Sequence, residues 1–212
     1  VPTGPVAGWT ETEFNDAAWS AGATGIGYDI NRTETELNTS YDHLFGVGGD
    51  VEDMMRSKNP SIYIRIPFEV PQPDGIGELK LRMKWDDGFV AYLNGDFLFS
   101  QNAPESLTWQ SAASSANHEA SAASFNLYDV TDTLGSLRAG QNTLAIHGLN
   151  RGTGSSDFII RPALLAGASL PGSTAQPTVQ FGGIEFSPDT GNQDQEFVEI
   201  TNPFSIAVAI SD

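Results

Sequence analysis

Apolar and polar residues alternate along two long segments near the middle of the chain. In residues 61–70, isoleucine, phenylalanine and valine occupy every second position. Residues 79–85 repeat this pattern, with a basic residue at each intervening position: Lys80, Arg82 and Lys84. A period of two puts alternate side chains on opposite faces of a strand, so both segments are predicted as half-buried β-strands. Pro67 cannot donate to a ladder, which indicates an edge position or a bulge in the first strand.

Two glycine turns follow the second strand. Asp87-Gly88 and Asn94-Gly95 are strong turn signals, since glycine accepts a positive φ freely and aspartate and asparagine tolerate it. Residues 89–93 between them have strand periodicity, and another apolar segment follows Gly95. These signals predict a strand, a turn, a strand, an Asn-Gly hairpin and a further strand. The core is therefore expected to be an antiparallel sheet.

Shorter apolar runs complete the expected fold. They predict three more strands, at residues 125–130, 143–150 and 157–165. Short helical turns are expected near residues 51–56 and 131–137. The polar stretches 31–58 and 100–124 indicate long loops. With 22 glycines, 12 prolines and few long amphipathic runs, the chain is predicted to be all-β with antiparallel sheets.

A change in composition marks a domain boundary near residue 167. Residues 1–166 are predicted to form one domain, and glycine, serine and proline make residues 167–177 a linker. Residues 178–212 contain three short apolar runs, at 179–186, 196–201 and 206–210. Three short strands give too small a core for independent stability. We therefore expect residues 178–212 to be a short C-terminal β segment from an incomplete second sandwich domain.

The net charge and the short apolar runs of the chain exclude two classes of partner, nucleic acid and the membrane interior. The 27 acidic residues against 10 basic ones give a net charge of −17. This charge repels phosphate backbones, so nucleic acid is not expected as a partner. An acidic surface suits a secreted protein in salty water, or serves only to keep the protein monomeric and dispersed. No apolar run approaches the ~20 residues that span a bilayer, so membrane insertion is not expected.

The sequence contains no motif for catalysis. It has no cysteine, which excludes disulfides and cysteine nucleophiles, and no serine lies in a nucleophile-elbow motif. Its histidines are His43, His118 and His147. Acidic residues are so common that any two could be proposed as a glycosidase pair. The chain is therefore predicted not to be an enzyme.

A glycine-rich stretch near the N-terminus admits two interpretations. Gly22, Gly25 and Gly27 are spaced like a phosphate-binding loop. No lysine and no helix pattern follow them. This absence favours a tight, close-packed turn beneath an aromatic residue.

Oxygen ligands for a hard cation gather around the two glycine turns. Asp86 and Asp87 precede the first turn, and Asn94 and Asp96 flank the hairpin glycine. Carboxylate and amide oxygens are the ligands that calcium prefers, so calcium is the one cofactor considered for these four residues, although the spacing is not that of an EF-hand. The alternative is structural. Asp87 then begins a turn, and Asp86 bonds nearby backbone amides.

Aromatic residues supply the first candidate ligand contacts. In carbohydrate-binding modules, rings on loops or sheet faces stack on the apolar side of a sugar. Three residues fit that role: Trp109, Tyr92 and Tyr63. The other three tryptophans are expected to fill the core: Trp9, Trp19 and Trp85.

Basic residues supply the second set of candidate contacts. The polar faces of two strands expected to pair carry four cations: Arg65, Lys80, Arg82 and Lys84. On so acidic a protein, this local positive face could hold an anionic glycan, such as a uronate or sulfated polysaccharide. The alternative is an ordinary solvated face balanced by neighbouring acids.

Three segments carry a resemblance to a known family. They are residues 86–95, residues 125–130 and the Leu-x-x-Gly-x-Asn-x-Leu strand within residues 137–150. In this order they resemble galactose-binding-domain-like jelly rolls, such as the sugar-binding domain of family 2 glycoside hydrolases. Residues 9–165 look more specifically like the modules that accompany lamin-tail and CotH-kinase-like domains in extracellular proteins of planctomycetes. The resemblance implies a non-catalytic antiparallel β-sandwich of the jelly-roll type, in a family that often carries calcium.

The C-terminal residues carry a second resemblance. Residues 184–188 and 196–203 are similar to the first two strands of a lamin-tail domain, whose remainder is expected beyond residue 212. Together the resemblances imply a secreted or cell-surface module of a larger protein, serving adhesion or carbohydrate binding. The partners implied are a polysaccharide or cell-surface glycan and the other domains of the parent protein.

A rival hypothesis is a structural subunit of an extracellular assembly. An incomplete lamin-tail segment leaves strand edges unpaired, and unpaired edges recruit strands from other chains. The candidate donors are the runs at residues 179–186 and 198–210. This hypothesis predicts self-association.

Overall fold

The computed structural model describes residues 1–30, 41–117, 119–168, 180–185 and 197–201. The chain divides into two compact units, residues 1–167 and residues 168–212, and each is described by itself. No helix within the described ranges combines the length and apolar character needed to cross a membrane.

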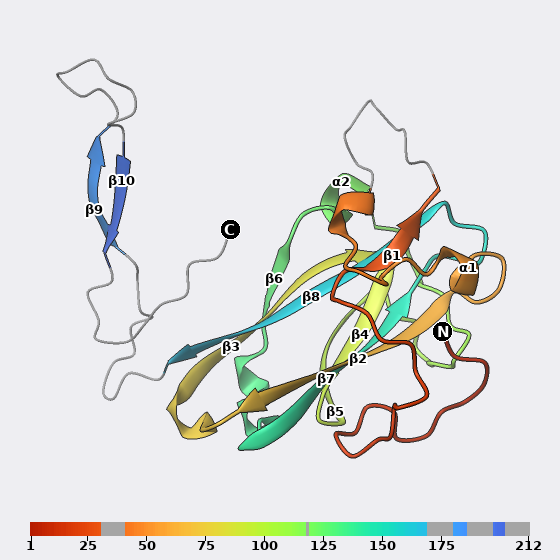
Figure 1. The fold of residues 1–212 in the computed structure, drawn as a ribbon, viewed down its shortest axis with the longest axis horizontal. Helices are drawn as coiled ribbons and strands as arrows, with labels where there is room; N and C mark the ends of the chain where they lie inside the picture. Colours follow the sequence, from red (N-terminus) through yellow and green to blue (C-terminus); the bar gives the residue numbers. More distant parts are fainter. Residues whose placement is uncertain (31–40, 118, 169–179, 186–196, 202–212) are drawn as a thin grey trace. The chain divides into compact units, whose positions relative to one another are not determined.

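Two four-stranded sheets form the first unit (Figure 1). Sheet A has the strand order β1 (Ile26–Asp29), β8 (Asp157–Ala168), β3 (Ile76–Asp86) and β6 (Asn126–Asp129). Sheet B has the order β2 (Ser61–Val70), β7 (Gly140–Leu149), β4 (Gly88–Leu93) and β5 (Asp96–Gln101). The strand pairs with a defined register are all antiparallel. This arrangement confirms the predicted all-β antiparallel sandwich.

Short helices lie between the strands. They are η1 (Tyr41–Leu44), α1 (Glu52–Met55), η2 (Pro73–Gly75), α2 (Glu119–Ala122) and η3 (Thr131–Ser136). Two of them, α1 and η3, confirm the helical turns predicted near residues 51–56 and 131–137. None exceeds six residues in the described part of the chain, so packing between the sheets, and not helix packing, stabilises the unit.

The hydrophobic core lies between the inner faces of the two sheets. Leu79, Leu81 and Met83 of β3 are buried there, as the alternation in residues 79–85 predicts. Trp85 is also buried in this cluster, as predicted, and its indole Nε1 donates to the Tyr128 hydroxyl at 2.9 Å. Sheet B contributes its own inward-facing residues: Ile62, Ile64, Phe89, Leu93 and Ile146.

The expected pairing of the two long strands is wrong. β2 pairs with β7 in sheet B, whereas β3 pairs with β6 in sheet A. Each strand carries a continuous apolar face. Because the two strands lie in opposite sheets, both apolar faces are buried in the one core between the sheets. The proline-containing connection through η2 therefore crosses from one sheet to the other. As Pro67 predicts, β2 is an edge strand.

The second unit contains one described hairpin. β9 (Gln180–Glu185) pairs antiparallel with β10 (Phe197–Thr201), with a register shift after Glu199. These strands lie within two of the three apolar runs predicted in residues 178–212. The third run, residues 206–210, lies outside the described residues, as do most of the predicted linker and part of the loop expected at residues 31–58.

Candidate functional site

Residues 9–16 lie across the outer face of sheet B. Trp9 stacks on Tyr63 of β2 with ring centroids 4.1 Å apart and planes within 4°. Its ring also meets the edges of Tyr92 on β4 and His147 on β7, at 6.0 and 6.3 Å. Trp9 is therefore buried as predicted, but outside the inter-sheet core. Tyr63 and Tyr92, two predicted sugar contacts, are half-buried beneath it, and this burial raises the pKa of both phenols.

Arg65 anchors this N-terminal segment to β2. Its Nε donates to Asp16 at 2.8 Å, and the guanidinium lies 5.2 Å from the ring centroid of Phe14. A guanidinium has five N–H donors, and Arg65 has five acceptors within reach. The remaining four are backbone carbonyls of Trp9, Glu11, Thr12 and Phe14.

These contacts correct the prediction that Arg65 shares an anion-binding face with the basic residues of β3. Arg65 lies on the outer face of sheet B, whereas Arg82 and Lys84 belong to sheet A. Its side chain is 5% exposed, and its donors are already used by the N-terminal segment. Arg65 is therefore placed to hold structure and not to bind an anionic ligand.

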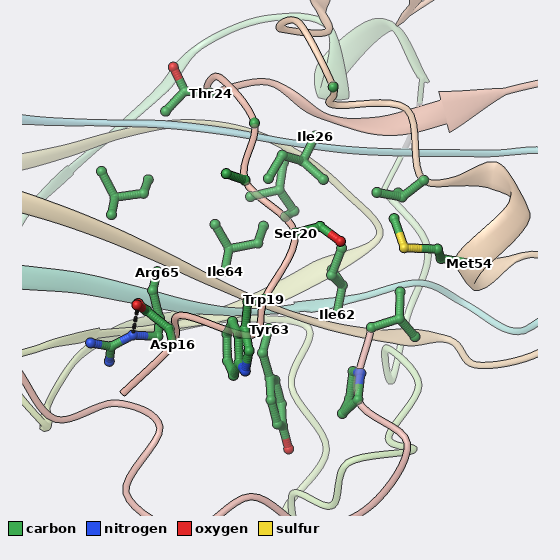
Figure 2. A pocket seen from close by; sticks show the side chains of 18 of the residues that line it. Asp16, Trp19, Ser20, Thr24, Ile26, Met54, Ile62, Tyr63, Ile64 and Arg65 are labelled. Carbon is green, nitrogen blue, oxygen red and sulfur yellow. Dashed lines mark hydrogen bonds and ion pairs between the residues drawn. The ribbon is translucent and has the colours of Figure 1, made fainter. Parts of the chain in front are cut away.

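A pocket of about 620 Å³ opens beside this anchor, between the N-terminal segment and the sandwich edge formed by β1, β8 and β2 (Figure 2). Ile26, Ile62 and Ile64 form an apolar floor, and the Trp19 indole forms a wall. The lining also includes polar side chains: Asp16, Arg65, Ser20 and Thr24. Apolar surface with a few convergent polar groups, in a volume of about 300–1,000 Å³, is typical of small-molecule sites.

The glycine-rich stretch forms one side of the pocket through close backbone packing. Gly25 has a φ of 100°, and a Cβ there would lie 2.1 Å from the Leu44 carbonyl oxygen. The Gly27 Cβ would lie 2.0 Å from the carbonyl oxygen of Phe158 on the neighbouring strand. These approaches confirm the predicted close packing, but the predicted tight turn is wrong, because the stretch is extended with one bend at Thr24 and Gly27 lies in β1. The consequence of the close packing is that the glycine-rich stretch runs directly against the sandwich edge.

Asp86 and Asp87, two predicted calcium ligands, form a buried carboxyl pair. Asp86 accepts a hydrogen bond from the Tyr41 hydroxyl at 3.3 Å and is next to Asp87 in the chain. Asp87 accepts from the backbone N–H groups of Asn117 and Arg151, at 3.0 and 2.7 Å. Burial, with the adjacent Asp87, raises the pKa of Asp86 to about 9. Asp86 is therefore the member of the pair that carries a proton at neutral pH.

This protonation predicts a pH dependence of stability. The folded protein keeps a proton on Asp86 that the unfolded chain releases above its ordinary pKa of 3.8, so the stabilisation is complete below that value and is lost as pH rises toward about 9. Asp86→Asn keeps a donor and an acceptor but does not titrate. Urea unfolding at about pH 5 and about pH 8.5 should show a smaller loss of stability for the variant. An equal loss in both proteins would contradict the assignment.

The other two predicted calcium ligands are also engaged. The Asn94 side chain accepts from Thr12 and from the Thr143 N–H, at 2.9 and 2.8 Å. Its amide donates to the Ser136 carbonyl and to Asn142, both at 2.7 Å. These four bonds use the full capacity of an asparagine side chain. The exposed Asp96 accepts from the Ser136 hydroxyl at 2.8 Å.

The four predicted ligands therefore do not fit one calcium ion. Asp86 and Asp87 precede β4, and Asn94 and Asp96 follow it, so six extended residues, or roughly 20 Å, separate the two pairs. Among the described residues, no group of three or more His, Asp or Glu side chains has the geometry of a metal site.

Ser61 and His147 form the contact that most resembles a nucleophile and base. Ser61 Oγ lies 2.8 Å from His147 Nε2, but its hydroxyl proton is directed to the Ser111 carbonyl at 2.7 Å. His147 Nε2 must then donate to Ser61, which is the reverse of general-base activation. Both residues are buried, and burial lowers the pKa of His147 to about 4. The pair is thus a structural bridge between β2 and β7.

The basic residues of β3 lie on the outer face of sheet A. Arg82 and Lys84 approach the ring of Phe125, with Arg82 Cζ 3.8 Å and Lys84 Nζ 4.8 Å from its centroid. Lys80, on the same face, forms an ion pair with Glu78 at 2.7 Å. Trp109 is half-buried in the loop after β5, where its carbonyl accepts from Asn59 at 3.1 Å. The predicted ligand contacts are therefore distributed over separate surfaces.

Two features of the pocket were missing from the sequence-based prediction. Trp19 was expected in the core, but it is half-buried and lines the pocket. The pairing of Asp16 with Arg65 beside the same pocket was not predicted either. A tryptophan immediately before a polar, glycine-rich stretch is the sequence signal that could have indicated Trp19, since such connecting stretches run over the surface.

Comparisons with known proteins found similarity only among solved structures. No protein-family model matches the chain, and no curated protein is significantly similar to it. The structural matches include a β-glycosidase from Bacteroides vulgatus (14% identity, TM-score 0.39, 76% of this chain and 18% of the other). They also include Bacteroides uniformis β-glucuronidase 2 (10%, 0.42, 76% and 16%) and a Streptomyces avermitilis α-L-rhamnosidase (17%, 0.35, 51% and 9%). The chain spans less than a fifth of each of these glycosidases.

Proposed function

We propose that this chain is a non-catalytic, carbohydrate-binding β-sandwich module of a secreted or cell-surface protein, and that a sugar ring occupies the pocket beside Trp19. The observation that carries the proposal is the pocket itself, which combines an indole wall, an apolar floor and a polar rim in about 620 Å³. A sugar ring has the matching chemistry, since its C–H face is apolar and its edge carries hydroxyl groups.

The indole of Trp19 is held in one orientation. Its ring meets that of Phe14 in an edge arrangement, with centroids 5.5 Å apart and planes at 62°. Phe14 is fixed in turn by the guanidinium of Arg65. A fixed ring loses little conformational entropy when a ligand binds, and this preorganisation favours affinity.

The polar groups of the pocket suit a neutral sugar. Arg65 and Asp16 already neutralise each other, so an added ionic charge would find no unpaired partner in them. The Asp16 side chain is still 43% exposed, and Ser20 and Thr24 are exposed. These oxygens can exchange hydrogen bonds with sugar hydroxyls.

Calorimetry with neutral sugars, chosen from a glycan array, tests the proposal. Trp19→Ala should weaken binding about tenfold or more, because the stacking surface is lost. Phe97→Ala, at an exposed ring on β5 outside the pocket lining, is the matched control and should bind as the wild type does. Absence of binding to every neutral sugar would overturn the proposal. So would a loss confined to Trp109→Ala, which would move the site to the loop after β5.

A second candidate function is assembly through strand edges. β2 is a ten-residue strand at the edge of sheet B, so one side of its backbone is not paired with another strand of that sheet. Two of its residues, Tyr63 and Arg65, also line the pocket. Edge strands of this length accept strands from other chains. Size-exclusion chromatography with light scattering at high protein concentration decides between the candidates. A monomer throughout would exclude assembly, and concentration-dependent oligomers would favour it.

A further inference from the structure

Three cations gather on the outer face of sheet A, and we call them the cationic patch: Arg82 and Lys84 of β3, and Arg161 of β8. β3 and β8 are neighbours in the sheet. Along β8, Ile159 lies on the same face as Arg161 and is covered by Tyr41, Leu44 and Ala122. The cationic patch thus begins where the cover provided by η1 and α2 ends.

Lys84 and Arg161 of the cationic patch differ from Lys80, the other basic residue on this face, in having no acidic partner in the described ranges. Lys80 has two acidic neighbours, since it pairs with Glu78 and lies opposite Asp129 of β6. Within the part of the chain that the structure describes, neither Lys84 nor Arg161 forms an ion pair. Lys84 and Arg161 are therefore two positive charges on neighbouring strands with no carboxylate partner among the described residues.

Electrostatic repulsion within the cationic patch supports this description. The pKa of Lys84 is lowered, first by burial and then by the positive charges of Arg161 and Arg82. Like charges on neighbouring strands destabilise a sheet. An anion placed against Lys84 and Arg161 would relieve that repulsion.

Apolar surface borders the cations. Arg82 lies opposite Leu127 of β6 in the strand register, and Leu127 is 56% exposed. Phe125 holds the Arg82 and Lys84 side chains against the sheet through the two cation–π contacts. The result is a sheet face on which the cations of β8 and β3 are bordered by apolar surface from Leu127 and Phe125.

We infer that the cationic patch is a second binding surface, separate from the pocket, and that it binds an anionic polysaccharide through Lys84 and Arg161. Carboxylate or sulfate groups of the polymer contact the two cations, and the apolar faces of its sugar rings lie against Leu127. A polymer whose sugar rings carry an anionic group and also present an apolar face matches this combination of cations and apolar surface.

Binding to soluble polymers tests this inference. The probes are polygalacturonate for carboxylates and dextran sulfate for sulfates, with neutral dextran and polyglutamate as comparisons. We expect binding to at least one of the two anionic polysaccharides, weakening as salt is added, and no comparable binding to neutral dextran or polyglutamate. Binding to one polysaccharide alone would identify the anionic group. Equal binding to polyglutamate would assign the surface to acidic peptides and overturn the inference.

Matched double variants locate the binding. Lys84→Gln with Arg161→Gln should weaken polysaccharide binding about tenfold or more. Lys58→Gln with Arg138→Gln removes the same charge from exposed positions elsewhere and should bind as the wild type does. Thermal melts check that both proteins are folded. An equal loss in both double variants, or no binding of either polysaccharide to the wild type at low salt, would overturn the inference. Neutral sugars probe the pocket separately, so the two proposals fail independently.

Discussion

Replacing Asn94 with alanine is expected to lower the free energy of unfolding by about 4 kcal/mol. Asn94 is 2% exposed and makes four side-chain hydrogen bonds, so its removal leaves several buried groups without partners. Its φ of 53° adds strain for alanine, about 1–2 kcal/mol. For a unit of this size, the melting temperature should fall by roughly 8–16 °C. Urea unfolding at neutral pH measures the change directly.

Two further variants separate the causes. Asn94→Gly keeps the positive φ without strain and loses only the hydrogen bonds, so it should be less destabilised than Asn94→Ala by about 1 kcal/mol. Asn126→Ala removes an asparagine with a single long hydrogen bond, 3.4 Å to the Ser124 carbonyl, and should change stability by less than about 0.5 kcal/mol. If Asn94→Ala is no more destabilised than Asn126→Ala, the four hydrogen bonds of the Asn94 side chain do not stabilise the fold.

Replacing Arg65 with methionine should release the N-terminal segment and lower the free energy of unfolding by about 3 kcal/mol. Methionine keeps most of the apolar stem but none of the five donors, so the carbonyls of Trp9 and Glu11 lose their partner. Because Trp9 then loses its position over Tyr63, its fluorescence should shift toward that of an exposed indole. Limited proteolysis should cut within residues 9–16 before the sandwich unfolds.

Asp16→Asn is the control for charge alone. Asp16 is 43% exposed and supplies one of the five acceptors, so its ion pair should contribute less than about 1 kcal/mol. Arg65→Lys keeps the charge but not the planar set of donors, and it should resemble the methionine variant more than the wild type. If Arg65→Lys has wild-type stability and protease resistance, the positive charge alone is enough to hold residues 9–16 on β2.

The alternation of apolar residues was enough to predict which side chains of each strand face the core. It was not enough to predict which strands pair, because β2 and β3 bury the same kind of face whether they pair in one sheet or pack across two. The Asn94-Gly95 turn shows the same limit. The dipeptide predicts the hairpin locally, but three of the four partners of the Asn94 side chain lie 42–49 residues away and the fourth lies 82 away.

The candidate surfaces depend on similar long-range contacts. Arg82 and Lys84 were predicted on an outer face, and they are there. Arg161, which completes the cationic patch, was placed beside them only when β8 was seen to neighbour β3. Trp19 was predicted in the core by its residue type. The pocket that it lines depends on two contacts of its segment: Arg65 of β2 holds Asp16, and the glycine-rich stretch packs closely against Leu44 and Phe158.

The way Arg65 and Asn94 hold the N-terminal segment also sets an order for folding during synthesis. Asp16 precedes Arg65 by 49 residues, and Thr12 precedes Asn94 by 82. At a translation rate of about 5–20 residues per second, residues 9–16 leave the ribosome several seconds before either partner is available. Trp9 and Trp19 stay in solvent during that interval, within reach of chaperones. Residues 9–16 therefore dock only after a delay set by the synthesis of Arg65 and Asn94.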